Sequence, residues 1–263
     1  MHVIPLFKSH YSLRSILTLE EAGETVKQAT KEKRNPALAP DSILDICIDN
    51  KITDVFLAED GMSAFLEAYF NCKKANLSLH YGLRVTVTGN ITEKSEESRR
   101  TDSKVVIFAR NAEGYKRLIQ ISTCAATEGF YYEPRIDAPS LERFWSPDLL
   151  YCIPFYDSFI YYNTLSFRSI VPAFPADPII FIEDNGLPFD ESIKKAIDLF
   201  DAKGQFERVL TKSIYYKQRA DFTAFQTYKC IRNRSTLNKP QLDHFASDEF
   251  CFEAYLEQVN ALS

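Results

Sequence analysis

Short apolar runs alternate with amphipathic segments along most of the chain. Seven runs rich in Val, Ile, Leu and Phe have the length of strands, and they predict strands at residues 3–7, 54–58, 84–88, 104–109, 149–154, 178–183 and 208–211. Apolar positions at helical spacing predict helices at residues 19–33, 40–50, 62–75, 112–127, 189–203, 220–232 and 247–262. This alternation favours a parallel sheet covered by helices, and the number of units favours an α/β barrel over an open sheet.

Two segments depart from this pattern. Residues 89–102 are polar and charged without apolar periodicity, which predicts a flexible loop or the tip of a hairpin. Residues 155–177 are rich in aromatic residues and proline, and the pattern assigns them no element. Because no internal repeat and no low-complexity linker divides the sequence, we expect a single domain over residues 1–263.

Composition narrows the class of protein. The 263 residues carry a formal net charge of −5, whereas proteins that hold nucleic acid through its phosphates have a basic surplus. Any contact with DNA is therefore expected to be weak or indirect. The N-terminus lacks the basic region and apolar core of a signal peptide, and no apolar run is long enough to span a bilayer. These features predict a cytoplasmic protein without membrane contact.

The cysteine spacing and the common enzyme motifs limit the possible activities further. Six cysteines are scattered without a C-x-x-C pair, and most have apolar neighbours, which favours buried hydrophobic residues over disulfides or zinc ligands. The sequence also lacks the G-x-S-x-G elbow, the P-loop and the dinucleotide fingerprint. Nothing in the sequence therefore supports a nucleophilic hydrolase or an enzyme of either nucleotide-binding class.

Residues 109–137 carry a recognisable order of motifs. An apolar run leads into a helix that contains N-E-G-Y, and G-F-Y-Y and P-R-I-D follow. This order resembles the N-terminal PHP domain (polymerase and histidinol phosphatase) of bacterial C-family replicative polymerases, the DNA polymerase III alpha subunits. The resemblance extends from about Val3 to about Tyr255, and residues 235–263 resemble the fold-back that leads to the polymerase palm. It implies one PHP-like domain folded as a distorted (β/α)7 barrel.

The positions that match metal ligands of the family have changed. PHP enzymes hold metal ions with histidines and carboxylates at the mouth of the barrel, and the metals activate water for phosphoester hydrolysis. This sequence keeps the glycines around those positions but replaces nearly all of the ligands. The matching positions hold, in chain order, Leu6, Lys8, Glu59, Asp60, Arg84, Asn185, Ser213 and Tyr215.

The resemblance thus implies a vestigial metal pocket with no catalytic residue, no metal ligand and no cofactor. Lys8 and Arg84 bring positive charge to places where the family binds cations, and this opposes metal binding. We hypothesise that these two side chains occupy the former cation volume and pair with Glu59 and Asp60.

The first function hypothesis is a non-catalytic PHP-like module that acts as a structural or docking subunit in DNA replication. The implied partners are a DNA polymerase, an exonuclease or both, and a free-standing module fits a viral or split polymerase system. A patch of aromatic residues is either part of the core or an exposed docking surface, because interfaces are enriched in tyrosine. The patch consists of Tyr156, Phe159, Tyr161 and Tyr162. A protein that mimics the PHP surface to bind a host enzyme is a related alternative.

The second hypothesis is a divergent metal-dependent phosphoesterase or 3′–5′ exonuclease. It would hold Mn or Zn in a rearranged site formed by Glu59, Asp60 and His10. One imidazole and two acids are a poor substitute for the full ligand set, so His10 is better interpreted as a hydrogen-bonded loop histidine. The sequence favours a pseudoenzyme over an active one.

Overall fold

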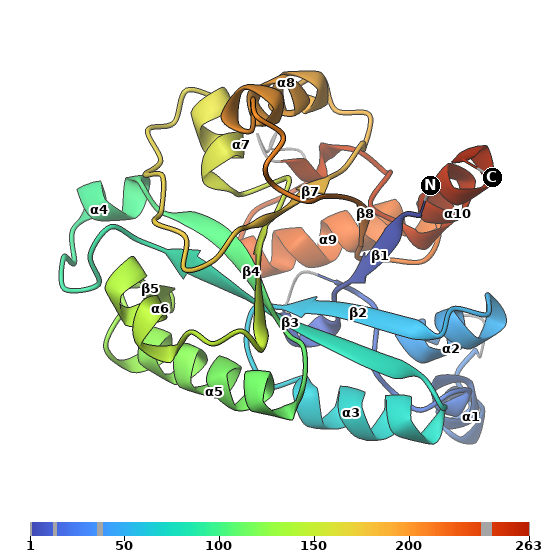
Figure 1. Ribbon diagram of the computed structural model, residues 1–263. Coiled ribbons are helices and arrows are strands. Elements are labelled where there is room, and N and C mark those ends of the chain that lie inside the picture. The colour runs from blue at the N-terminus through green and yellow to red at the C-terminus, as the bar shows by residue number, and fades with distance from the viewer. Residues whose placement is uncertain (1, 13–14, 36–38, 238–243, 263) are drawn as a thin grey trace. The chain divides into compact units, whose positions relative to one another are not determined.

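The computed structural model describes residues 2–12, 15–35, 39–237 and 244–262. Its strands, labelled in Figure 1, are β1 (Ile4–Phe7), β2 (Asp54–Glu59), β3 (Ser78–Val87), β4 (Ser103–Ala109), β5 (Arg135–Ile136), β6 (Leu149–Ile153), β7 (Ile179–Ile182) and β8 (Arg208–Ile214). Its helices are α1 (Glu24–Lys31), α2 (Ile43–Asp49), α3 (Phe65–Lys74), α4 (Glu96–Arg100), α5 (Ala112–Thr127), α6 (Ala138–Phe144), α7 (Phe159–Thr164), α8 (Asp190–Phe200), α9 (Phe222–Asn233) and α10 (Phe252–Leu262).

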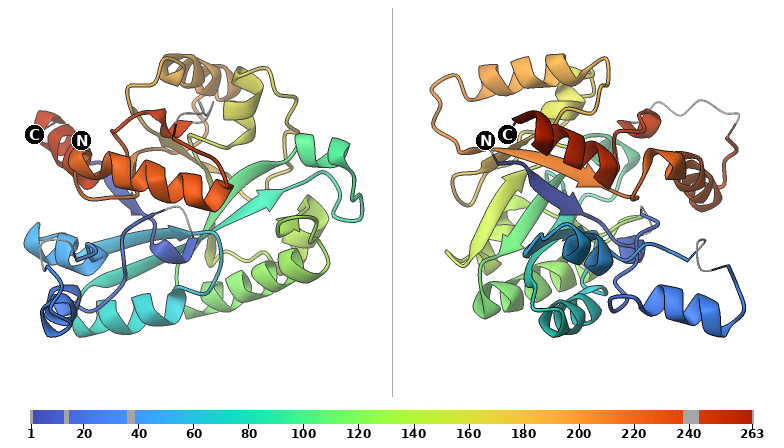
Figure 2. Two further views of the ribbon diagram at one scale, coloured as in Figure 1. Left: turned by 180° about the vertical axis from the view of Figure 1, so that it is seen from behind. Right: turned by 90° about the vertical axis from the view of Figure 1, so that its right-hand side faces the viewer.

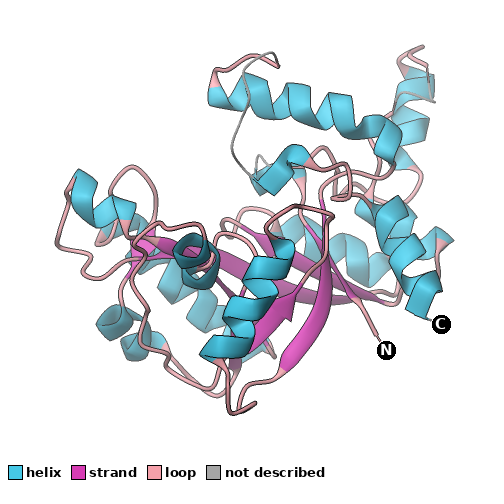
Figure 3. Cartoon of the chain, turned by 90° about the horizontal axis from the view of Figure 1, so that it is seen from above, coloured by secondary structure: helices cyan, strands magenta, loops and turns pink. Residues whose placement is uncertain are grey.

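The predicted alternation of strands and helices is confirmed (Figure 3). Each predicted strand and each predicted helix corresponds to one of these elements, and α5 has the predicted bounds. Four shorter elements were not predicted: β5, α4, α6 and α7. In the described part of the chain, every helix is too short or too polar to cross a membrane.

The strands form a closed barrel. Hydrogen bonds join them in the order β2-β1-β8-β7-β6-β4-β3-β5, and β2 also pairs with β3. Seven strands therefore close into a ring, with β5 added beside β3, and the predicted distorted α/β barrel is confirmed. The distortion lies in β4, which is antiparallel to both β3 and β6, although the alternation predicts parallel strands. Residues 88–102 join β3 to β4 as the connection of a hairpin and contain one short helix, α4.

Close contacts within the chain cluster into two compact units, whereas the sequence predicts a single domain. Unit 1 comprises Met1–Glu59, Ser63–His80 and Lys212–Ser263, and unit 2 comprises Asp60–Met62 and Tyr81–Thr211. Strands β3 and β8 each run from one unit into the other. Because the chain passes from one unit to the other within these strands, the sequence contains no linker that would predict the division.

Within unit 1, the first and last elements of the chain lie side by side (Figures 1 and 2). The Phe7 ring in β1 stacks on the Phe252 ring in α10, with centroids 6.2 Å apart. Tyr215 N–H donates to the Phe250 carbonyl, and Phe252 N–H donates to the Tyr216 carbonyl, both at 3.0 Å. Residues 244–262 therefore pack on the segment that follows β8. Residues 238–243 and 263 of the predicted fold-back lie outside the described residues.

Within unit 2, the N-E-G-Y motif explains how α5 begins. The Asn111 side chain accepts hydrogen bonds from the N–H groups of Glu113 and Gly114, both at 3.0 Å, and so caps the helix. A Cβ atom added at Gly114 would lie 2.3 Å from the Asp148 carbonyl oxygen, so only glycine allows the helix to approach this loop. From this start α5 packs its buried face, which includes Leu118 and Ile121, against β4.

Strands β3 and β4 form a hairpin, as one reading of residues 89–102 predicts. Its tip contains α4, which begins at Ser95 with a side-chain cap to the Ser98 N–H. The hairpin alternative is therefore present, and the short helix in its tip was not predicted. Because α4 buries only the side chain of Ser98, its polar sequence shows no apolar periodicity that would predict a helix.

The predicted aromatic patch lies in the core of unit 2. Tyr156, Phe159 and Tyr161 are buried, and Tyr162 is half-buried. Helix α7 carries most of the patch and lies beside α8 (Figure 1), and the Phe159 ring meets the Phe200 ring at 5.3 Å. The alternative of an exposed docking surface is corrected accordingly, because α8 covers this face.

Candidate functional site

Glu59 ends β2 in unit 1, and its carboxylate is only 1% exposed. It accepts a hydrogen bond from the Ser9 N–H at 2.7 Å and a second from the Ser12 hydroxyl. Burial raises the pKa of Glu59, whereas the Ser12 hydrogen bond and the charge of the buried Lys8 oppose this rise. Ser9 and Ser12 of the S-x-Y-S sequence therefore donate hydrogen bonds to the buried Glu59 carboxylate. The charge of Lys8 acts on the same carboxylate.

Arg84 lies in β3 of unit 2 between two carboxylates. Its guanidinium, 8% exposed, pairs with Asp60 at 3.0 Å and with Asp157 on its other terminal nitrogen. Asp157 also accepts a hydrogen bond from the Tyr162 hydroxyl at 3.3 Å. The predicted pairing of Arg84 with Asp60 is thus present. Asp157 was not predicted, because it lies in the aromatic segment that the pattern left unassigned.

A second ion pair follows on the same face of the β3–β4 hairpin. Thr86 faces Lys104 across the two strands, and the Lys104 ammonium donates to the Thr86 hydroxyl and to Glu133. Burial and the positive charge of Arg84 lower the pKa of Lys104. Burial acts to raise the pKa of Glu133, but the charge and hydrogen bond of Lys104 outweigh it and lower this pKa. Arg84 and Lys104 on this face are therefore each paired with carboxylates.

Asn185 stands where the resemblance places a histidine, and it is completely buried in unit 2. Its amide donates to the Tyr156 hydroxyl and to Glu183, both at 3.0 Å. The Tyr156 hydroxyl donates in turn to Asp190 at 2.9 Å, and Asp190 accepts the Asn185 N–H at 2.9 Å. Burial, followed by the charges of Glu183 and Asp190, raises the pKa of Tyr156. Asn185 therefore connects Glu183, which follows β7, through its side-chain amide, and Asp190 at the start of α8 through its backbone N–H.

The last group of predicted positions lies in unit 1. Leu6 is buried in β1, and Tyr215 packs its ring against Phe225 and Phe245 at 5.8 and 5.0 Å. Ser213 is half-buried at the end of β8. The neighbouring Lys212, 1% exposed, pairs with Glu249 at 3.2 Å. These positions contribute apolar packing and a further buried cation.

The acids at these positions have hydrogen-bond partners within the chain. Among the described residues, no group of three or more His, Cys, Asp and Glu side chains is placed to hold a metal ion. Glu59 is bonded to Ser9 and Ser12, whereas Asp60 is bonded to Arg84. His10 begins a short 3-10 helix, His10–Ser12, where the sequence predicts a hydrogen-bonded loop histidine. Its backbone N–H donates to the Leu17 carbonyl at 2.9 Å, and among the described residues its buried Nδ1 has no hydrogen-bond partner. The rearranged site of Glu59, Asp60 and His10 therefore has its two acids engaged by other groups.

Two other sequence interpretations concern residues outside this region. All six cysteines are buried, as their apolar neighbours predict. His80 stacks on Phe56 at 4.3 Å and contacts the Asp54 carboxylate at 2.9 Å, so it has a structural position on the surface of β2.

Comparison with known proteins relates this chain to the PHP domain family and to DNA polymerase III alpha subunits. Residues 36–158 match the PHP domain family. Over 260 residues the chain is 24% identical to the DNA polymerase III alpha subunit of Deinococcus radiodurans, an alignment that covers 93% of this chain and 18% of that subunit. It is 27% identical to the alpha subunit of Thermus aquaticus over 56% of this chain and 13% of that subunit. It is 30% identical to the alpha subunit of Chlamydia trachomatis over 36% of this chain and 8% of that subunit. The chain thus spans less than a fifth of the length of these relatives.

Proposed function

Because the chain is a PHP-domain relative of the DNA polymerase III alpha subunits, we propose that it is a non-catalytic PHP module. In this proposal it acts as a structural or docking subunit in DNA replication, and its partners are a DNA polymerase, an exonuclease or both. Its contact with DNA is weak or indirect, in line with the net charge of −5.

Arg84 is the observation that carries this proposal. The resemblance places a metal-binding carboxylate at this position, and the guanidinium here pairs with Asp60 and Asp157 instead. A divalent cation at these acids would have to displace a permanent positive charge, since arginine does not lose its proton in proteins. The guanidinium of Arg84 therefore already pairs with both carboxylates and compensates part of their negative charge.

Lys8 supports the same conclusion in unit 1. The resemblance places a histidine ligand there, and the lysine is buried at 4% exposure where its charge acts on Glu59. An ammonium has three donors and no acceptor, so it cannot serve as a ligand while protonated. We infer that the positions Leu6, Lys8, Glu59, Asp60, Arg84, Asn185, Ser213 and Tyr215 are the remains of a metal pocket that now serves stability.

An activity assay separates this proposal from a divergent phosphoesterase or exonuclease. Purified protein is incubated with Mn²⁺ or Zn²⁺ and either single-stranded DNA or a chromogenic phosphate ester. We expect no release of nucleotide or phosphate above that of the Glu59→Ala and Asp60→Ala variants. Metal-dependent release that either variant abolishes would show that the chain is an enzyme.

The docking role requires a separate experiment. Tagged protein is expressed in its native host, and the proteins captured with it are compared with those captured by the tag alone. We expect a replicative polymerase or exonuclease to be enriched with the full chain. Repeated recovery of unrelated metabolic enzymes in its place would contradict the proposal.

A further inference from the structure

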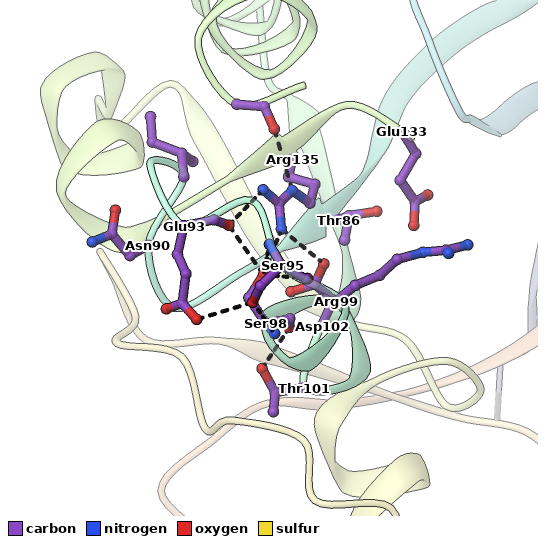
Figure 4. Close-up of polar contacts among 12 residues, drawn as sticks. Thr86, Asn90, Glu93, Ser95, Ser98, Arg99, Thr101, Asp102, Glu133 and Arg135 are labelled. Atoms are coloured by element: carbon purple, nitrogen blue, oxygen red, sulfur yellow. Dashed lines mark hydrogen bonds and ion pairs between the residues drawn. The ribbon is translucent and has the colours of Figure 1, made fainter. Parts of the chain in front are cut away.

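The G-F-Y-Y turn of unit 2, residues 129–132, has a rigid base. A Cβ atom added at Gly129 would lie 1.9 Å from the Arg135 carbonyl oxygen, so the turn begins in close contact with β5. The completely buried Arg135 side chain donates to the Gly129 carbonyl at 3.2 Å and to the Ser98 hydroxyl of α4 at 3.3 Å (Figure 4). One arginine therefore holds both the base of the turn and α4.

Two tyrosine rings and two guanidinium groups form a column on this base. The Arg135 guanidinium lies 5.1 Å from the centre of the Tyr131 ring, and the Tyr131 and Tyr132 rings meet edge to face with centroids 4.8 Å apart. The Arg99 guanidinium lies 4.8 Å from the centre of the Tyr132 ring, and Figure 4 shows Arg99 extending from α4 away from Arg135. The column thus begins at a buried arginine and ends at Tyr132, which is 67% exposed.

The backbone of Tyr132 is strained. Its φ is 61°, in the left-handed region that bulky side chains rarely adopt. The Tyr131 N–H donates to the Glu133 carbonyl at 3.1 Å and closes the turn around it. Because the ring is mostly exposed, burial offsets little of this strain. Strained backbone of this kind is concentrated at functional sites, where the surrounding structure holds it in place.

The exposed groups of the turn define a class of ligand. Phe130 is a second exposed aromatic residue beside Tyr132. Arg99 is about half exposed, and its contact with Glu96 at 3.8 Å is a loose surface pair that contributes little. An aromatic ring offers a flat face for a nucleobase, and a guanidinium beside it offers charge and hydrogen bonds for a phosphate.

We propose that Tyr132 and Arg99 form a stacking site for single-stranded nucleic acid. A base stacks on the exposed tyrosine ring, and the guanidinium binds a phosphate of the same strand. Duplex DNA fits less well, because its bases stack on one another and are not available to the ring. The net charge of −5 keeps the affinity low and sensitive to salt. This site goes beyond the docking role, since it requires no partner protein.

Binding of a fluorescently labelled thymidine oligonucleotide to the purified chain, followed by anisotropy at low ionic strength, tests the stacking contact. We expect Tyr132→Leu to weaken binding about fivefold or more, the usual effect of losing one stacked base. Tyr69→Leu is the matched control, because this exposed tyrosine of α3 has the rings of Phe65 and Phe70 as neighbours, and it should keep the wild-type affinity. No binding by the wild type, or equal losses in both variants, would overturn the proposal and leave the docking role untouched.

An abasic strand of the same length separates stacking from charge without a change in the protein. We expect the wild type to bind it about as weakly as Tyr132→Leu binds the thymidine strand. Equal affinity of the wild type for the two strands would overturn the stacking site.

The salt dependence tests the phosphate contact. Arg99→Gln should lower the slope of log affinity against log salt concentration by about 0.7, the contribution of one phosphate contact on a single strand. Arg117→Gln, which changes an exposed arginine of α5, should keep the wild-type slope. An unchanged slope in Arg99→Gln would contradict the assignment of the phosphate to Arg99.

Discussion

Arg84 sets the electrostatics of the candidate site at the scale of single residues. Its guanidinium bridges Asp60 and Asp157 in a region where each charge is mostly removed from water. In such an arrangement the attraction within the group offsets the cost of burial, but only while every member is present. Loss of the guanidinium removes the ion-pair partner that these two carboxylates share.

We therefore expect Arg84→Met to lower the free energy of unfolding by about 3–5 kcal/mol, the usual effect of breaking a buried ion pair. Lys116→Met is the matched control, because its partner Glu113 lies at 2.7 Å but both side chains are about two-thirds exposed. An exposed pair of this kind contributes at most about 1 kcal/mol. Urea denaturation of both variants measures the difference. Equal losses would show that Arg84 is no more than a surface charge.

Glu59 gives a prediction about pH. Burial raises its pKa above the ordinary value of 4.5, so the folded state binds this proton more tightly than the unfolded state. The resulting stabilisation is complete below the unfolded pKa and is lost as the pH rises through the folded pKa. Relative to Glu59→Gln, the wild-type free energy of unfolding should fall over this range by about 1.4 kcal/mol per unit of pKa difference. Urea titrations of both proteins from acid to neutral pH test this, and a constant difference would contradict it.

The sequence reveals only part of this site. The reversed charges at Lys8 and Arg84 predict their interactions with Glu59 and Asp60, because the motifs place all four residues. Asp157, Lys104 and Glu133 carry no motif, and only the folded hairpin brings Lys104 and Glu133 together. Asp157 also adopts a left-handed backbone with φ of 62°, which no spacing rule predicts.

At the scale of elements, the long periodic segments were predictable and the short ones were not. Helix α5 has 16 residues, a capping asparagine and a clear apolar face, and its predicted bounds are confirmed. Strand β5 has two residues and α4 has five, which is too few for a period to emerge. Helix α6 does carry a signal, since Asp137 caps it and a proline lies in its first turn. Yet these short elements hold the hairpin tip through Arg135.

The close approach of β5 to the G-F-Y-Y turn predicts a steric effect. A Cβ atom at Gly129 would lie 1.9 Å from the Arg135 carbonyl oxygen, so Gly129→Ala must push the backbone of β5 away from its place. We expect a loss of about 2 kcal/mol or more in the free energy of unfolding, as for other overpacked sites.

Gly61→Ala is the control for this effect, because an added Cβ meets nothing within 4 Å there. Thermal and urea denaturation compare the two variants. A tolerated Gly129→Ala would mean that the turn and β5 are not in close contact.

At the scale of the whole molecule, the strands close into the seven-stranded ring that the sequence predicts, and the positions that the resemblance matches to metal ligands include the buried cations Lys8 and Arg84. Ring closure depends on backbone pairing and apolar alternation, neither of which requires a bound metal. This independence allows the fold and the chemistry to diverge. The alpha subunits are much longer than this chain, so their activities do not transfer to it by similarity alone.

We propose that protein cations have replaced metal ions at these positions. Purified wild-type protein is equilibrated with Mn²⁺, freed of unbound metal, and analysed by mass spectrometry for metal per chain. We expect far less than one Mn²⁺ per chain, with the same trace content in Asp60→Ala. A stoichiometric content in the wild type that Asp60→Ala removes would contradict it.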